Sequence, residues 1–139
     1  MLQQDGIVVH FDDSKAIDVW AEEFKVEEVL TNYMSNAIHH IGGTKEITIT
    51  MTPKGNVVRI SVFNTGTPIP EEDLERLWEK FFKVDKSHSR QYGGSGIGLS
   101  IVKAIMDAFH QQCGVLNHAD GVEFWFELDS EAQKTDSTD

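Results

Sequence analysis

Two asparagines four residues apart, Asn32 and Asn36, are the first side chains whose type and spacing suggest chemistry. In a helix this spacing places both amides on one face, and apolar neighbours such as Tyr33 and Ile38 put that face at the edge of a core. Buried amides need hydrogen-bond partners, and an amide oxygen is a suitable hard ligand for Mg²⁺ that bridges nucleotide phosphates. Taken alone, the pair favours the simpler explanation of surface or capping amides.

A glycine-rich run, Gly94-Ser95-Gly96-Ile97-Gly98-Leu99, stands where a loop is expected to become a helix. Glycines let the backbone approach a phosphate, and the free N–H groups at a helix start attract the anion. The same pattern also marks ordinary tight turns, and neither a Rossmann unit before it nor a P-loop Lys after it supports the phosphate. On its own the run leaves both explanations open.

A third candidate, Asn64-Thr65-Gly66-Thr67-Pro68, follows a predicted strand. Gly66 would permit a tight turn and the close approach of a flat ligand, and the Asn64 amide could pair with the edge of a nucleotide base. In isolation, a turn that merely ends the strand explains this segment equally well.

Charge is distributed unevenly along the chain. The sequence has 12 Lys and Arg against 23 Asp and Glu, a net charge of −11 that argues against nucleic acid as the main partner. An anionic ligand must therefore be met by local positive charge. Four cations, Lys80, Lys83, Lys86 and Arg90, stand against the single anion Asp85 between residues 80 and 95. This segment suits a phosphate ligand, with a solvated basic loop as the alternative.

These residues need a scaffold, which the hydropathy pattern predicts. Alternation indicates strands, and three- and four-residue steps indicate helices. The expected elements are strands over 6–11 and 17–21, a helix over 24–41 ending at Gly42-Gly43, a hairpin of strands 47–51 and 57–63 with its turn at 53–56, a short helix over 70–78 opened by Pro70, a loop over 83–95, a helix over 97–109, and strands 115–116 and 122–128. This order predicts an α/β two-layer sandwich, a sheet covered by helices on one face.

Length and composition limit the number of domains and the class of protein. A chain of 139 residues is one domain, and 40% apolar residues can fill a core. No apolar run approaches the ~18 residues of a membrane helix, and the single Cys113 excludes an internal disulfide and indicates a reducing compartment. Residues 130–139 are polar and are expected to form a frayed tail.

The motifs, taken together and in order, resemble those of two-component sensor histidine kinases. Residues 28–38 resemble the N box, 64–70 the first glycine box, 77–83 the F box and 94–102 the second glycine box. The amino-acid sequences of residues 63–70 and 80–86 are similar to those of Gram-positive sensors of the vancomycin-resistance type. This resemblance covers residues 5–129 and implies a Bergerat-type (GHKL) ATP-binding fold, a mixed sheet of about five strands with three helices on one face.

The resemblance also implies a site for ATP and Mg²⁺, with a catalytic domain over 1–129 and an ATP lid over about 83–95. Asn36 and Asn32 would hold the metal and the phosphates, and Asn64 and Gly66 would receive the adenine. Phe81 would be a core or lid-anchor residue, and cations near the lid would neutralise charge during phosphoryl transfer. The further nucleotide-binding residues implied are His39, His40, Phe81, Lys83, Lys86, Arg90, Gly94, Gly96, Gly98 and Leu99.

Three departures from the family pattern concern affinity. Asn64 stands where the family usually has Asp, although its side-chain oxygen can still accept a bond from the adenine amino group. His39 and His40 replace the usual Lys and Tyr; at pH 7 His39 is a weaker phosphate contact than Lys, whereas His40 can still stack on adenine. The lid is short, and the last glycine box, at residues 120–122, matches the family pattern poorly.

The resemblance favours phosphoryl transfer over hydrolysis. Related ATPases of the gyrase, mismatch-repair and chaperone types carry a water-activating Glu where this chain has Asn32, and an amide cannot act as a general base. Glu28, one turn earlier, could assist the acceptor, although a helical Glu is usually just solvated. None of the six His residues is followed by Glu or Asp, as a phosphoacceptor His would be.

The expected protein is therefore a protein-histidine kinase catalytic domain that does not phosphorylate itself alone. Its expected partners are the phosphoacceptor-histidine hairpin domain of the full-length kinase and a response regulator. The domain itself is expected to be monomeric and cytoplasmic, unless an exposed Trp78 or Phe109 contradicts the monomer. Two alternatives remain open at this point: a degenerate nucleotide-binding module that serves protein interaction, and a hydrolytic ATPase of the same fold.

Overall fold

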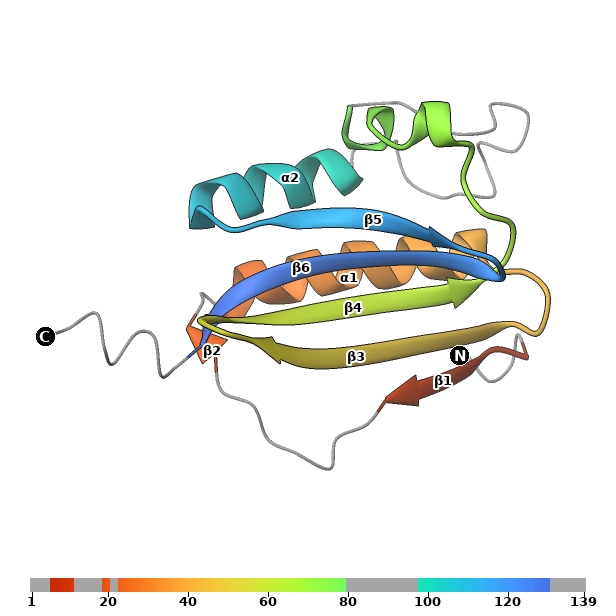
Figure 1. Cartoon of the computed structure of the whole chain (residues 1–139), viewed down its shortest axis with the longest axis horizontal. Coiled ribbons are helices and arrows are strands. Elements are labelled where there is room, and N and C mark those ends of the chain that lie inside the picture. Colours follow the sequence, from red (N-terminus) through yellow and green to blue (C-terminus); the bar gives the residue numbers. More distant parts are fainter. Residues whose placement is uncertain (1–5, 12–18, 21–22, 80–97, 131–139) are drawn as a thin grey trace, which may run out of the picture.

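A computed structural model describes residues 6–11, 19–20, 23–79 and 98–130. They form two layers, a mixed sheet and the helices that lie on one of its faces (Figure 1). The helices are α1 (Glu23–His40) and α2 (Gly98–Phe109), and the strands are β1 (Val8–Phe11), β2 (Val19–Trp20), β3 (Glu46–Lys54), β4 (Val57–Thr65), β5 (Cys113–His118) and β6 (Gly121–Ser130). The predicted α/β two-layer sandwich is confirmed.

The sheet has six strands in the order β1-β3-β4-β6-β2, with β5 also paired to β6. The β1–β3 pair is the only parallel pair of neighbours among the described strands; β3, β4 and β6 pair antiparallel, and β5 and β2 share the outer side of β6. The β4–β6 pairing places the end of β4 beside the β5–β6 turn, so the segment after β4 lies within hydrogen-bonding reach of that turn.

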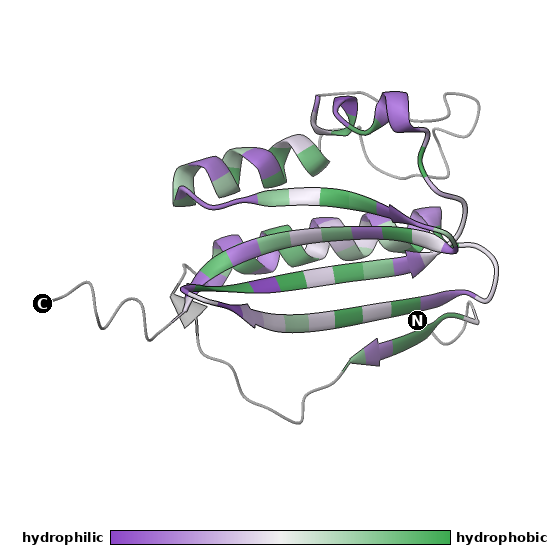
Figure 2. Cartoon of the chain, in the orientation of Figure 1, coloured by the Kyte–Doolittle hydropathy of each residue, from purple (hydrophilic) through white to green (hydrophobic). Residues whose placement is uncertain are grey.

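The core lies between the sheet and the two helices. Alternate residues of β4 and β6 point to it, as the alternating hydropathy along these strands shows (Figure 2). Tyr33 of α1 is fully buried, with ring centroids 5.4 Å from Phe124 and 5.8 Å from Phe126. Its hydroxyl donates to the Trp125 carbonyl at 3.0 Å, and burial raises its pKa, which keeps that donor protonated.

Two predicted elements differ from the structure. The short helix over 70–78 is two 3-10 turns, Glu71–Asp73 and Arg76–Trp78, closed by bonds such as Asp73 N to the Pro70 carbonyl at 2.9 Å. An α-helix this short would gain little stability, because nucleating a helix is costly and few hydrogen bonds follow. Pro53 belongs to β3 rather than to the turn: β1 pairs with β3 only from Glu46 to Ile49, so Pro53 occupies an outer position where no described strand needs its N–H.

Apolar residues at the ends of elements show a further difference. Phe24 fits the apolar pattern of the helix but is 83% exposed in the first turn of α1. Trp78 and Phe109, in contrast, are partly buried against the core, and the Trp78 ring lies 6.2 Å from that of Phe124. Neither contradicts the expected monomer. No helix among the described residues is long and apolar enough to cross a membrane.

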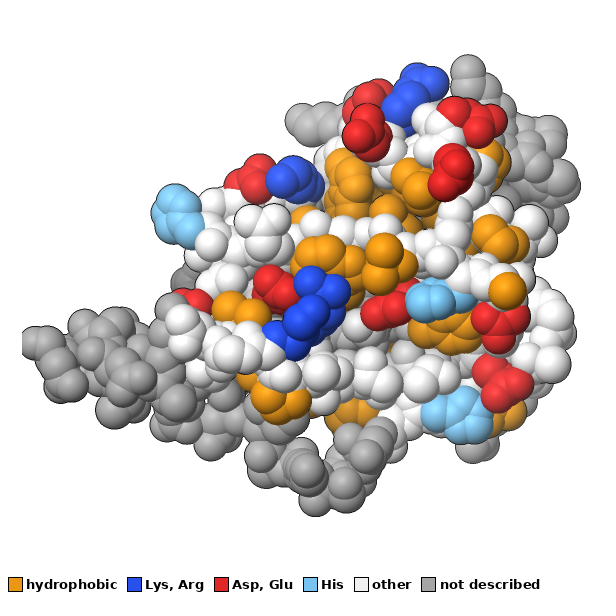
Figure 3. Space-filling model, viewed as in Figure 1, with side chains coloured by type: hydrophobic (Ala, Val, Ile, Leu, Met, Phe, Trp, Pro, Cys, Tyr) orange, Lys and Arg blue, Asp and Glu red, His pale blue; other side chains and the backbone are white. Residues whose placement is uncertain are grey.

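No described helix or strand covers the face of the sheet turned away from α1 (Figure 3). Arg59, which alternates with the buried Val58 and Ile60, stacks 3.7 Å above the Trp125 ring and donates to Glu127 at 2.8 Å. This ion pair and this stacking contact link β4 to β6 on that face of the sheet. The candidate site lies on the opposite, helix-covered face.

Candidate functional site

The three predicted motifs meet along α1. Gly98, the first residue of α2, lies so close to Asn32 that a Cβ on it would stand 2.7 Å from Asn32 Oδ1. Gly66, after β4, lies against the end of α1, where a Cβ would stand 2.9 Å from the His40 carbonyl. Asn32 and His40 are separated by about 12 Å along the helix, at 1.5 Å per residue. The site therefore has two ends, one at Gly98 and one at Gly66.

The Gly66 end is defined by Asn64, whose side chain is fully buried. Asn64 Nδ2 donates to the Thr65 carbonyl at 3.0 Å, whereas Oδ1 is buried without a hydrogen-bond partner in the described part of the chain. Reversing the amide would set its oxygen against that carbonyl, so the bond to Thr65 fixes the orientation. Gly66 itself has φ +149°, a conformation that favours glycine.

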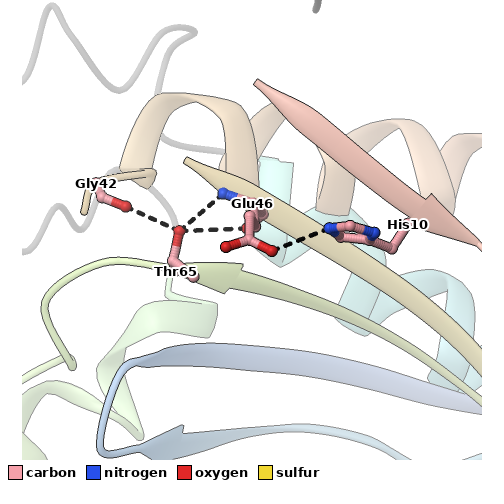
Figure 4. Close-up of polar contacts among 4 residues, drawn as sticks. All are labelled: His10, Gly42, Glu46 and Thr65. Atoms are coloured by element: carbon pink, nitrogen blue, oxygen red, sulfur yellow. Dashed lines mark hydrogen bonds and ion pairs between the residues drawn. The ribbon is translucent and has the colours of Figure 1, made fainter. Parts of the chain in front are cut away.

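Thr65 anchors the same segment (Figure 4). Its hydroxyl donates to the Gly42 carbonyl at 2.8 Å and accepts from the Glu46 N–H at 2.9 Å, which joins the end of α1 to the start of β3. Hydrogen bonds from Thr44 and then His10 hold the pKa of the Glu46 carboxyl below its usual value. His10 of β1 donates to Glu46 at 3.0 Å, which ties the edge strand to this end of the sheet.

The histidines that replace the family's usual Lys and Tyr have separate contacts. His39 Nδ1 donates to the Ser35 carbonyl at 2.7 Å, and the ring is on the exposed side of α1. His40 Nε2 donates to the Thr67 carbonyl at 3.2 Å and thus joins α1 to the segment after Gly66. A protonated His40 can still make this donation, so this contact does not depend on the charge of the ring.

The Gly98 end carries the two helical asparagines, both partly buried. Asn32 Nδ2 donates to the Glu28 carbonyl at 2.9 Å, within the same helix. Among the described residues, Asn36 has no side-chain hydrogen bond, so its amide is available to a ligand. The Glu28 carboxylate is 43% exposed and lies 3.9 Å from Lys25 Nζ, the arrangement of a helix-surface ion pair.

Part of the predicted site lies outside the described residues. This holds for the whole lid over 83–95 and for the tail after Ser130. It also holds for six of the predicted nucleotide-binding residues, which are Phe81, Lys83, Lys86, Arg90, Gly94 and Gly96. Of the glycine-rich run, only Gly98 and Leu99 are described, and Leu99 packs against the core.

One residue of the site was missed by the sequence analysis. Asn117 of β5 binds the backbone of Ile69 through both ends of its amide: it accepts from Ile69 N at 2.9 Å and donates to Ile69 O at 2.7 Å. The feature that marks Asn117 is that a polar side chain pairs, in the register of β5 and β6, with the fully buried Val122. The predicted strand, 115–116, was too short to place Asn117 on that inward face.

Fold and site together define a nucleotide-binding catalytic domain in which an asparagine-bearing helix faces two glycine segments. The chain belongs to the family of histidine kinase-, DNA gyrase B- and HSP90-like ATPases, whose model matches residues 21–132. Within this family, the relatives and solved structures that match the chain are sensor histidine kinases, which confirms the resemblance.

Individual relatives agree with this assignment. The sensor protein VanSB of Enterococcus faecalis is 35% identical over 74% of this chain, which confirms the similarity to vancomycin-resistance sensors. The solved catalytic domain of histidine kinase ThkA is 33% identical, with a TM-score of 0.80 over 93% of this chain and 82% of that one; ThkA is also solved in complex with the response regulator TrrA. Full-length ShkA in complex with AMPPNP is 27% identical, with a TM-score of 0.76 over 92% of this chain and 27% of that one.

The match to VanSB covers 23% of the length of that relative, and the chain spans about a quarter of the curated relatives it matches. The shared part is the catalytic ATPase domain of these kinases.

Proposed function

We propose that this chain binds Mg-ATP and donates the γ-phosphoryl group to a histidine on a dimerisation and phosphoacceptor hairpin, in two-component signal transduction. The observation that carries the proposal is the buried Asn64 Oδ1, an acceptor with no partner among the described residues. Leaving such an atom unsatisfied costs about 1–3 kcal/mol. The exocyclic amino group of adenine is a donor that would satisfy it, at the position where the motif implies base recognition.

Asn36 and Asn32 are proposed to hold Mg²⁺ together with the nucleotide phosphates. The residues fit this role because amide oxygens are hard ligands and the Asn36 amide has no other side-chain bond among the described residues. When bound, Mg²⁺ would neutralise phosphate charge. Phosphoryl transfer depends on positioning and on charge neutralisation, so Lys83, Lys86 and Arg90 are proposed to assist it, with His39 as a weaker contact.

The choice of acceptor follows from Asn32. Its amide cannot take a proton from water, and its Nδ2 is already engaged with the Glu28 carbonyl. We therefore propose transfer to a protein side chain rather than hydrolysis, with Glu28 as the residue that assists the acceptor and His40 beside the base. The family membership and the ThkA–TrrA complex support a response regulator as the next partner. We place the reaction in the cytoplasm, where ATP is available.

Calorimetric titration with a non-hydrolysable ATP analogue and Mg²⁺ tests the nucleotide site. We expect a Kd between micromolar and millimolar, about −8 to −4 kcal/mol, and a loss of at least tenfold in Asn36→Ala. The matched control is Thr31→Ala, an exposed position on the same helix, which should bind like the wild type. No heat and no nucleotide-dependent shift in melting temperature would overturn the proposal in favour of an interaction module.

A second experiment tests the acceptor. The phosphoacceptor hairpin domain of a VanSB-type kinase is added with labelled ATP, and label should appear on its histidine only in the presence of this chain. The chain alone should remain unlabelled. Steady release of phosphate by the isolated chain, without transfer, would instead identify a hydrolytic ATPase.

A further inference from the structure

Asn117 makes an unusual contact for a side chain on a strand. Its amide forms two hydrogen bonds with one residue, Ile69, accepting from the N–H at 2.9 Å and donating to the carbonyl at 2.7 Å. This is the pattern by which one strand pairs with the next. The side chain thus replaces a missing neighbouring strand for a backbone segment that leaves the sheet.

The register of the sheet connects this contact to Asn64, at the Gly66 end of the site. Asn117 pairs with Val122 across β5 and β6, and Asn64 pairs with the same Val122 across β4 and β6. Both asparagines therefore stand at one level of the sheet and on its helix-covered face, separated by the width of one strand. Asn64 is the first residue of a segment whose last residue, Ile69, is bonded by Asn117.

The segment between them is fixed at intervals. Gly66 N donates to the Asp120 carbonyl at 3.0 Å, in the β5–β6 turn, and the side chain of Ile69 is 4% exposed. Without Asn117, the Ile69 N–H and carbonyl would have no other protein partner among the described residues. The segment from Asn64 to Ile69 would then be held at Gly66 and by the bond from His40 to the Thr67 carbonyl, and its Ile69 end would have no backbone hydrogen bond among the described residues.

We infer that Asn117 is a positioning residue for base recognition: it holds the Asn64–Ile69 segment so that the Asn64 acceptor is aligned before the nucleotide arrives. The inference rests on the proposed function, because it assigns Asn64 to the base. Fixing the segment in advance removes an ordering cost from binding. The alignment concerns one ligand atom in particular, the donor on the exocyclic amino group of adenine.

The test compares Mg-ATP with the analogue whose purine lacks the 6-amino group, titrated against three proteins. The wild type should prefer ATP by about tenfold, as expected for one hydrogen bond to a buried acceptor. In Asn117→Ala we expect that preference to fall to about twofold. The matched control is Leu116→Ala, the preceding residue, whose side chain is 46% exposed; it should keep the full preference.

The ratio of the two affinities separates positioning from mere structural support, because a general loss of stability lowers both affinities alike. Asn117→Asp, which keeps the size and one of the two bonds, serves if the alanine variant does not fold; it should also lose preference. An unchanged ratio in a folded Asn117 variant would overturn this inference alone. A wild type that does not bind ATP would overturn the proposed function, and the inference with it.

Discussion

The two ends of the candidate site differ in how their polar groups are satisfied. At the Gly66 end, which we propose receives the base and call the base end, Thr65, Gly66 and Ile69 are bonded to Gly42 after α1, to β3, to β5 and to the β5–β6 turn. At the Gly98 end, which we propose receives the phosphates and call the phosphate end, Asn32 bonds within its own helix and Asn36 has no side-chain bond in the described part of the chain. The base end is thus shaped by the protein's own hydrogen bonds, whereas the phosphate end has amide groups that, in the proposed function, would face a charged ligand and its metal.

This contrast has a physical reason. A neutral base is recognised by a few hydrogen bonds of fixed direction, so rigid placement increases affinity. Phosphates and Mg²⁺ are recognised by charge and by hard oxygen ligands, which must exchange water for the incoming ions. If the contrast holds, substitutions at the base end should mainly reduce the free energy of unfolding. Substitutions at the phosphate end should mainly reduce the affinity for Mg-ATP.

The largest effect is expected for Gly121→Ala. A Cβ on Gly121 would overlap the Asn64 carbonyl and would stand 2.7 Å from the Phe63 ring, so the backbone of β4 or β6 must move. We expect a loss of about 3 kcal/mol in the free energy of unfolding, measured by urea denaturation. The control is Gly42→Ala, where the added Cβ meets its nearest neighbour at 3.6 Å and should change little. Equal stabilities would show that the base end is not rigid.

Thr65→Val should have the next largest effect on stability. The substitution keeps the shape but removes the hydroxyl, which leaves the Gly42 carbonyl and the Glu46 N–H without these bonds. We expect a loss of about 2 kcal/mol in the same measurement. Thr50→Val, at an exposed position of β3, is the matched control and should stay within about 0.5 kcal/mol of the wild type.

Gly98→Ala should have the smallest effect on stability and a clear effect on binding. Its Cβ would stand 2.7 Å from Asn32 Oδ1, the end of a side chain that can rotate away. We expect a folded protein of nearly unchanged melting temperature whose Mg-ATP affinity falls about tenfold, or about 1.4 kcal/mol. Titration and a melting scan are sufficient to decide this. A large loss of stability with normal affinity would reverse the contrast between the two ends.

Much of this arrangement could be predicted from the sequence. The periodicity around Asn32 and Asn36 predicts α1 almost to the residue, and Gly42-Gly43 marks its end. The alternation in residues 57–63 and 122–128 predicts β4 and β6. Local patterns suffice here because helix and strand periods differ and glycine interrupts both.

Other features could not be predicted, because they depend on contacts between distant segments. The two 3-10 turns after Pro70 and the strand position of Pro53 depend on neighbours in space. The role of Asn117 needs a partner 48 residues away in the chain. The pairing of Gly98 with Asn32 likewise joins residues that only the packing of α1 against α2 brings together.

The sequence by itself determined the family, the order of the elements and the residue types at the site, because chemistry and periodicity are local properties of the chain. Only the tertiary structure decided which of those residues are already bonded. Asn64 and Asn36 are both asparagines in motifs of the same family, yet one is fully buried with a fixed amide and the other is partly buried and unpaired among the described residues. That difference arises from burial and hydrogen bonding, which are set by what folds against each side chain.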